Sequence, residues 1–415
     1  MSAGEASVLA VDAGDLTFAS GLLSIVRPAL DLLEPGGRLE LHSSSDAAAQ
    51  DLPSFCRVEH HRYLGAEPAG GATRHLLEKG PLGQLREGGP TASAPLLGDH
   101  PSTAAFLLAL PHPSRADPGS GFAPRGVRWE AGGPSYPFTL LERDRVAPEE
   151  IGQLYDQAVA SQWDPATAIP WERARGVPPA LERAVAQAMT FLAENELAAL
   201  YVPARFLPRI HPAFVESAAF LATQLADEAR HLDAFQKRAR LAGDFRCVSS
   251  AITSRSLLSL LQLEDFLEAS FLLSVLGEGT FLDLLRFIEL HAPDEATAEL
   301  CRRARADEAR HVHFGMAHVR HGLATDPGLA ARLQAAVEKR AAALGDVGGV
   351  PHRVQDALTI LAARGTDPRS IARGHEAYRE LLQTMHDGRA KRLLKAGFSA
   401  EQAERLSALH TPNFM

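Results

Sequence analysis

Ala226-Asp227-Glu228-Ala229-Arg230-His231 is repeated without change as Ala306-Asp307-Glu308-Ala309-Arg310-His311. Each copy places a glutamate and a histidine three positions apart, so that the two side chains are neighbours on one face of a helix. A helix offers a carboxylate and an imidazole to one metal ion in this way. The repeat therefore predicts a buried site for two metal ions.

The chain around the two copies has helical periodicity. It predicts four long helices with short connections, which is typical of an up-and-down bundle. Their expected ranges are Pro179–Leu200, Pro212–Ala242, Ser256–His291 and Asp294–Gly322. Each hexapeptide falls on the second helix of a pair, so the preceding helix should supply one further carboxylate.

The candidates for these further carboxylates are Glu194 and Glu196 on the first helix, and Glu264, Glu268 and Glu278 on the third. Spacing favours Glu196, which lies 32 positions before Glu228, and Glu278, which lies 30 positions before Glu308. Glu278 also lies in an apolar stretch, where a buried carboxylate must be paired or bound to metal. Glu194 remains the alternative to Glu196.

The predicted ligands are Glu196, Glu228, His231, Glu278, Glu308 and His311. Four carboxylates and two imidazoles suit two iron ions, with manganese or a mixed pair as the alternative. Zinc prefers fewer ligands and more nitrogen or sulfur. One Glu-x-x-His pair alone would be a common chance pattern, but two identical copies with matched upstream glutamates favour a metal site.

With these residues the segment 178–322 resembles the ferritin-like di-iron carboxylate superfamily, in particular its oxygen-activating branch. The resemblance implies that Asp227, Arg230, Asp307 and Arg310 surround the ligands. A metal-bound imidazole needs its other N–H held, and an aspartate lies four residues before each histidine. Arginine three residues after each aspartate can neutralise it. We therefore expect each aspartate to hold the histidine of its own helix.

Three features depart from the resembled pattern or extend it. Gly277 and Gly279 flank Glu278 and predict either a π-bulge, with room for oxygen or substrate, or close helix packing. Leu282 stands where the resembled monooxygenases carry a threonine, so their proton delivery does not carry over. His318 is a candidate third imidazole ligand, although an ordinary helix-face histidine is the favoured interpretation, and His313 lies nearby.

Residues 1–80 predict a two-layer α/β sandwich with the order β-α-β-α-β-β. Helices are expected at 21–33 and, capped by Asp46, at 46–55. Leu32–Leu41 and Leu52–Arg57 resemble the TusA-like sulfur-carrier family, although the cysteine that opens the first helix of that family is absent here. A persulfide carrier needs a thiolate at that place. We interpret the module as a degenerate docking or dimerisation domain, with Cys56 structural.

Residues 81–145 are rich in glycine and proline and predict a connector, in which Ala104–Leu110 is a strand or a short helix. Helix should resume near Pro148, and Trp163 and Trp171 are interpreted as ordinary core. Residues 146–415 would form the metal domain. Its last helices, expected at 327–343, 354–364, 368–397 and after Ser399, would support the bundle or form a homodimer interface.

The net charge of −9 argues against nucleic acid as the main partner. Three distant cysteines and the lack of a leader segment favour the cytoplasm. No apolar run approaches the roughly 20 residues that span a bilayer. We expect a mainly α ferritin-like protein that uses oxygen, a small-molecule substrate and an external electron donor. The alternatives are a ferroxidase or metal-handling protein, and a structural adaptor.

Overall fold

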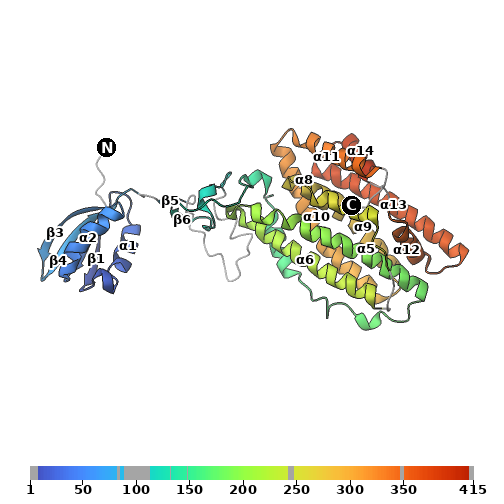
Figure 1. The fold of residues 1–415 in the computed structure, drawn as a ribbon, viewed down its shortest axis with the longest axis horizontal. Coiled ribbons are helices and arrows are strands. Elements are labelled where there is room, and N and C mark those ends of the chain that lie inside the picture. Colours follow the sequence, from blue (N-terminus) through green and yellow to red (C-terminus); the bar gives the residue numbers. More distant parts are fainter. Residues whose placement is uncertain are drawn as a thin grey trace. The chain divides into compact units, whose positions relative to one another are not determined.

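The structure is a computed structural model that describes residues 8–81, 85–87, 113–130, 132–146, 148–241, 247–345 and 350–410. The chain divides into two compact units (Figure 1). The first comprises Met1–Gly88 with Arg128–Gly133, and the second comprises Gly89–Val127 with Pro134–Met415. The expected segment Ala104–Leu110 lies outside the described residues.

The first unit contains a four-stranded sheet in the order β1-β2-β4-β3. Its elements are β1 (Val8–Gly14), α1 (Leu23–Asp31), β2 (Arg38–Ser43), α2 (Asp46–Val58), β3 (Arg62–Ala69) and β4 (Ala72–Glu78). The pair β1–β2 is parallel, and β4 runs antiparallel to both β2 and β3. This is the predicted β-α-β-α-β-β order. Its core is closed by fully buried leucines such as Leu39, Leu41 and Leu77.

Two local details of this unit differ from the expected ranges. Helix α1 is shorter than predicted and keeps Pro28 in its interior. Ser45, and not Asp46, is the residue at the N-cap of α2; its side chain makes no capping hydrogen bond, and Asp46 is already helical. An acidic residue in the first turn still interacts favourably with the helix dipole, which explains why Asp46 resembles a cap in the sequence.

A short ladder also pairs β5 (Leu85–Glu87) with β6 (Arg128–Glu130).

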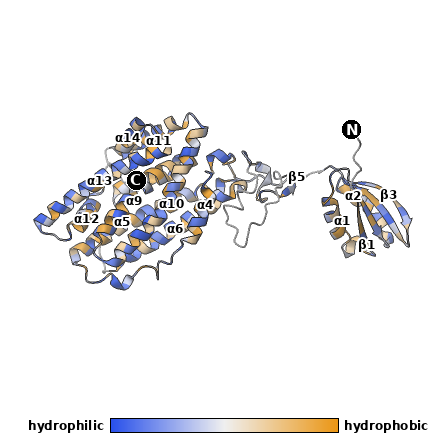
Figure 2. Cartoon of the chain, turned by 180° about the vertical axis from the view of Figure 1, so that it is seen from behind, coloured by the Kyte–Doolittle hydropathy of each residue, from blue (hydrophilic) through white to orange (hydrophobic). Residues whose placement is uncertain are grey.

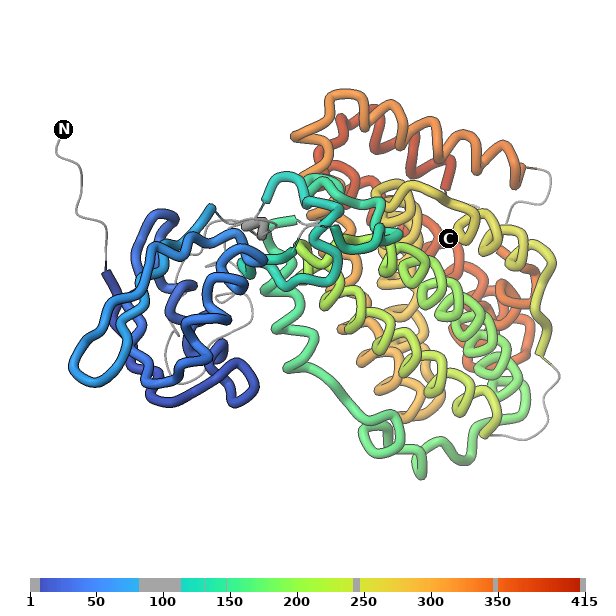
Figure 3. The backbone as a smooth tube through the Cα atoms, turned by 60° about the vertical axis from the view of Figure 1, so that its left-hand side comes forward, coloured from blue at the N-terminus to red at the C-terminus, as the bar shows by residue number. Residues whose placement is uncertain are grey.

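The second unit is built around a helical bundle. Its central elements are α5 (Pro179–Ala204), α6 (Val215–Arg240), α8 (Phe266–Ser270), the π-helix η7 (Phe271–Glu278), α9 (Gly279–His291) and α10 (Glu295–Thr325). Helix α5 packs along α6, and α9 packs along α10, as the tube in Figure 3 shows. The predicted pairing of each hexapeptide helix with the helix before it is confirmed.

The predicted third helix was wrong over its first part. Ser256–His291 is not continuous, because α7 (Ala251–Leu261) ends and a new helix starts at Phe266. The Asp265 carboxylate caps this start by accepting the N–H of Glu268 at 2.9 Å. The Arg205 guanidinium donates to the Leu263 carbonyl at 3.0 Å, so the backbone groups released by the break are satisfied.

The π-helix η7 leads directly to Glu278, and all eight of its residues are buried. It matches one of the two interpretations drawn from the flanking glycines. Close packing is present as well, against Gly315 of α10. A Cβ at Gly315 would lie 2.6 Å from the Ser274 Cβ and 3.3 Å from the Ser270 carbonyl oxygen. The widened turn therefore fits against α10 only because α10 has a glycine there.

The remaining helices surround the bundle. They are α4 (Ile151–Ala160), α11 (Leu329–Leu344), α12 (His352–Ala363), α13 (Pro368–Ala396) and α14 (Ala400–His410). Helix α4 contacts α6, α12 contacts α5, and α13 contacts α9. Hydrophobic and hydrophilic residues alternate along these helices in Figure 2, as expected when one face is buried. Within the described ranges, no helix has both the length and the apolar character to cross a membrane.

Candidate metal centre

All six predicted ligands lie in the interior of the bundle. Their side chains come from α5, α6, the end of η7 and α10, and each residue is at most 4% exposed: Glu196, Glu228, His231, Glu278, Glu308 and His311. The alternative carboxylates lie elsewhere. Glu194 is half-buried beside Ser249, and the Glu264 side chain is 77% exposed and pairs with Arg205.

The ligand atoms form two groups, each of which can hold one metal ion. One group contains Glu196, Glu228, His231 and Glu308, and the other contains Glu228, Glu278, Glu308 and His311. Within each group the nitrogen and oxygen atoms lie within 4.8 Å of one another. The two groups share Glu228 and Glu308, which is the arrangement that two neighbouring ions bridged by carboxylates require.

Both histidines turn Nδ1 toward the shared carboxylates. His231 Nδ1 lies 3.2 Å from Glu308 Oε1, and His311 Nδ1 lies 3.0 Å from Glu228 Oε1. Yet four of the buried ligand atoms have no hydrogen-bond partner within the described part of the chain. They are His231 Nδ1, both Glu228 carboxylate oxygens and Glu278 Oε2. Buried polar atoms without partners are costly, so atoms that point at a common space indicate a ligand that fills it.

The charge of the centre also fits two divalent ions. Asp227 and Asp307 are matched by Arg230 and Arg310 in buried ion pairs. Among the predicted ligands this leaves four glutamates, whose charge in the ionised form equals that of two divalent cations. A buried carboxylate cluster of this size needs such compensation. The donor set of oxygen and imidazole nitrogen, without a thiolate, suits iron or manganese.

The acid–base properties of the ligands follow from burial and mutual contact. Burial raises the pKa of Glu196, and the charge of Glu228 raises it further. Burial and then Glu308 raise the pKa of Glu278 in the same way. Burial would also raise the pKa of Glu228, but the charge of His311 outweighs it and the pKa falls below its ordinary value.

The two imidazoles respond in the opposite direction. Burial would lower the pKa of His231, but its hydrogen bond to Asp307 and the surrounding carboxylates hold that pKa well above its ordinary value. The pKa of His311 is raised because Glu228 and Glu308 outweigh burial. Without metal, the imidazoles thus carry positive charge at the place where cations are needed.

The aspartates contact the histidines in a crossed pattern, and this corrects our expectation. His231 Nε2 of α6 lies 3.0 Å from Asp307 Oδ2 of α10, and His311 Nε2 of α10 lies 3.2 Å from Asp227 Oδ2 of α6. Each aspartate therefore holds the histidine of the other hexapeptide. With Nδ1 toward the carboxylates, Nε2 points across to the facing helix and away from the aspartate of its own helix.

The arginines join both aspartates into one network. Arg230 pairs with Asp227 and also donates to Asp307 at 3.1 Å. Arg310 donates to Asp307 at 2.6 Å and to Asp227 at 3.0 Å. The predicted neutralisation at i+3 is present in both copies, and each arginine adds a contact across the interface.

Three residues that hold the centre were missed in the sequence. Trp163 Nε1 donates to Asp307 Oδ2 at 2.7 Å, and its ring stacks on His231 and lies under the Arg230 guanidinium. Gln162 donates to Asp227 at 3.1 Å. Trp163 packs against the core as interpreted, but the sequence did not indicate that it also holds Asp307. The Gln162-Trp163 pair is conspicuous in the sequence before the first bundle helix. The sequence does not show that these side chains contact the aspartates.

Gln224 is the third missed residue. It lies one turn before Glu228 on α6 and donates to Glu278 Oε1 at 3.2 Å. His318, by contrast, belongs to neither ligand group: its Nε2 donates to the Arg145 carbonyl at 2.8 Å, and its Nδ1 accepts from Ser270. His313 is exposed. The favoured interpretation of His318 as an ordinary histidine agrees with these contacts.

No family model and no curated protein matches this chain. Solved structures of R2-like ligand-binding oxidases resemble its fold at low identity. The form without metal cofactor is 17% identical with a TM-score of 0.44, and the match covers 60% of this chain and 97% of that chain. A variant with an anaerobically reconstituted Mn/Fe cofactor is 18% identical with a TM-score of 0.46, covering 60% and 94%. A variant with an aerobically reconstituted Fe/Fe cofactor is 18% identical with a TM-score of 0.43, covering 60% and 93%.

Proposed function

We propose that this chain is an oxidase or oxygenase with a two-metal centre, most simply two iron ions, or iron and manganese, held by Glu196, Glu228, His231, Glu278, Glu308 and His311. The observation that carries the proposal is the pair of four-residue groups that share Glu228 and Glu308. The partnerless ligand atoms at the shared position support it. When bound, such ions supply the reduction of oxygen and the oxidising power for a small organic substrate.

The residues of the chain would contribute orientation and exclusion of water. Asp307 and Asp227 fix the ring orientation of His231 and His311, and the arginines hold the aspartates. Gln224 holds Glu278 on the side of η7. The buried walls of η7 and α10 keep water away from the ligands, which strengthens every electrostatic interaction inside. Electrons would come from a separate donor, because the sequence has no nicotinamide or flavin fingerprint.

Metal analysis combined with anaerobic reduction and stopped-flow exposure to oxygen tests the proposal. We expect two metal ions per chain and an oxygen-dependent absorbance change after reduction. Glu308→Ala should lose metal from both groups because the residue is shared. Glu194→Ala, on the same helix as Glu196 but outside both groups, is the matched control and should bind as wild type. If Glu308→Ala binds two ions, the proposal is wrong.

The same experiment separates the alternative function. A ferroxidase would keep turning over added ferrous iron in the absence of an organic substrate and accumulate ferric iron. An oxygenase would react once with oxygen and stop until it is reduced again. The proposal covers hydroxylation, desaturation or N-oxygenation of the substrate.

We also propose that residues 1–80 are a degenerate sulfur-carrier-like docking module, 81–145 a connector and 146–415 the catalytic domain. The β-α-β-α-β-β order supports the first assignment. The Cys56 thiol is buried, and burial raises its pKa to about 11, so it stays protonated and unreactive near neutral pH. A carrier function would require an accessible thiol with a lowered pKa.

A further inference from the structure

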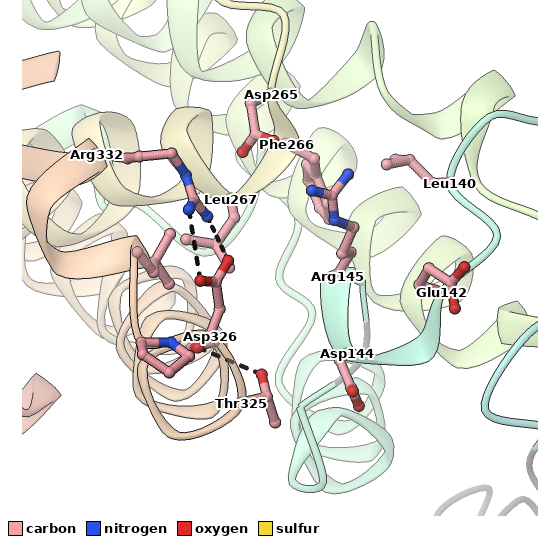
Figure 4. A pocket seen from close by; sticks show the side chains of 13 residues that line it. Leu140, Glu142, Asp144, Arg145, Asp265, Phe266, Leu267, Thr325, Asp326 and Arg332 are labelled. Atoms are coloured by element: carbon pink, nitrogen blue, oxygen red, sulfur yellow. Dashed lines mark hydrogen bonds and ion pairs between the residues drawn. The ribbon is translucent and has the colours of Figure 1, made fainter.

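A cavity of about 320 Å³ lies where α8 begins and α10 ends (Figure 4). Its wall combines the segment before α4, the start of α8, the end of α10 and the start of α11. Leu140, Phe266, Leu267 and Leu329 give it an apolar lining. The volume lies at the lower end of the roughly 300–1,000 Å³ that small-molecule sites occupy. The cavity can thus take a compact organic molecule.

The charged groups on the wall differ in whether they have partners. Four carboxylates line the cavity, and each is engaged: Glu142 with Arg115, Asp144 with His321, Asp265 with the Glu268 N–H, and Asp326 with Arg332. The Arg145 guanidinium, in contrast, makes no hydrogen bond or ion pair with any described residue, and Figure 4 shows it beside Phe266. After the hydrogen bond from Arg332, the Arg145 charge also helps to lower the pKa of Asp326, but among the described residues its guanidinium donors are left for a ligand.

The backbone at Arg145 is fixed to the bundle. Its carbonyl accepts the His318 Nε2–H at 2.8 Å, and His318 is itself fully buried in α10. The backbone from which the Arg145 guanidinium extends is therefore fixed by this hydrogen bond. A planar guanidinium of this kind suits bidentate recognition of a carboxylate.

Phe266 connects this cavity to the metal centre. It is the residue that the cavity shares with a second, much smaller cavity of about 10 Å³, lined also by Phe206, Gln224, Ser274 and Phe314. Gln224 donates to Glu278, so the inner cavity ends at a metal ligand. The Phe266 ring lines both spaces and lies 5.2 Å from the Phe206 ring and 5.0 Å from the His318 ring.

We propose that the outer cavity is the substrate site of this chain and takes a monocarboxylate with a compact apolar body. The carboxylate binds Arg145, the apolar body lies on Phe266 and Leu267, and movement of the Phe266 ring admits the reacting end toward Gln224 and Glu278. Binding at Arg145 needs no metal. Only the passage to the metal centre rests on the proposed function.

Binding of benzoate and hexanoate to the full chain, measured by calorimetry on metal-free protein, tests the site. Benzylamine and hexylamine serve as cationic probes of matched size. We expect the carboxylates to bind, Arg145→Gln to weaken them by about tenfold because a charge-assisted hydrogen bond is lost, and Thr325→Trp to abolish binding by filling the exposed mouth. Arg320→Gln is the matched control, since Arg320 pairs with Glu150 and does not line the cavity.

Proton relaxation of bound benzoate tests the connection to the metal centre. With manganese in place of zinc, relaxation should be faster, and Thr325→Trp should remove the difference. The site is refuted if amines bind in place of carboxylates, or if Arg145→Gln and Thr325→Trp bind as wild type. Carboxylate binding in a protein that takes up no metal would refute the proposed function and leave the site intact, so the two failures are distinguishable.

Discussion

Asp307 shows how one side chain can serve a ligand on another helix. It contacts His231 across the interface and lies four residues before His311 on its own helix. A double-mutant cycle of metal affinity distinguishes the two partners. We expect Asp307→Asn to weaken metal binding by roughly 10–100-fold, and its coupling with His231→Gln to exceed its coupling with His311→Gln. The reverse order of couplings would contradict the crossed arrangement.

His318 is the residue whose charge state should govern acid stability. Burial lowers the pKa of its imidazole to about 4, against an ordinary value near 6.5. The unfolded chain therefore binds a proton between these values while the folded chain does not, and stability falls as the pH falls from about 6.5 toward 4. From pH 7 to pH 5 the loss should be about 2 kcal/mol.

Urea unfolding of metal-free protein at both pH values checks this. His318→Gln, which keeps a donor for the Arg145 carbonyl, should show less dependence on pH than wild type by that amount. His313→Gln, exposed on the same helix, should retain the dependence of the wild type. Equal slopes for His318→Gln and wild type would exclude His318 as the titrating group.

At the same scale, the side chains placed together in the cluster were largely predictable. A Glu-x-x-His pair is a property of one helix, and the matched spacing of Glu196 and Glu278 follows from helix length. The crossed contacts and Trp163 were not predictable, because they depend on the distance between α6 and α10 and on a loop that precedes both. Local spacing contains no information about which helix face another helix meets.

At the scale of elements, the π-helix η7 and Gly315 of α10 form a matched pair. Alanine in place of a helical glycine ordinarily stabilises by about 1 kcal/mol. Here the added Cβ would lie 2.6 Å from the Ser274 Cβ, so we expect Gly315→Ala to destabilise the bundle by about 1–3 kcal/mol. Denaturant unfolding measures this, and Ser274→Gly should partly restore stability in the double variant.

Gly345 supplies the control for that substitution. It ends α11, and a Cβ there would meet nothing within 4 Å. Gly345→Ala should therefore be neutral or mildly stabilising. If Gly315→Ala behaves like Gly345→Ala, the π-helix is not held by contact with Gly315.

The bundle helices were predicted because their apolar spacing is long and regular. The break before Phe266 was missed for the same reason: leucines continue through it on both sides. Its signal was Asp265 three residues before Glu268, a capping pattern inside an apparently continuous helix. Arg205 and Arg209, which donate to the Leu263 and Glu264 carbonyls at the break, come from the end of α5 and the turn after it, far away in sequence.

At the scale of the whole molecule, the division into two compact units predicts two unfolding events. Calorimetry of the full chain should resolve two transitions. Leu39→Ala should lower only the transition of the first unit, and Leu285→Ala only that of the second, each by roughly 2–5 kcal/mol because both side chains are fully buried. A single transition that both variants shift would show that the units unfold together.

The crossed aspartates make the two helix pairs mutually dependent. The pair α5–α6 carries Glu196, Glu228 and His231, yet the carboxylate that orients His231 belongs to α10. The pair that ends in α10 likewise lacks the carboxylate that orients His311, and Asp227 of α6 supplies it. A fragment with one helix pair would thus contain three ligands but lack the aspartate that orients its histidine ring. Both helix pairs must therefore be assembled before either set of ligands is oriented to bind metal. Folding of the bundle and formation of the metal centre become one event.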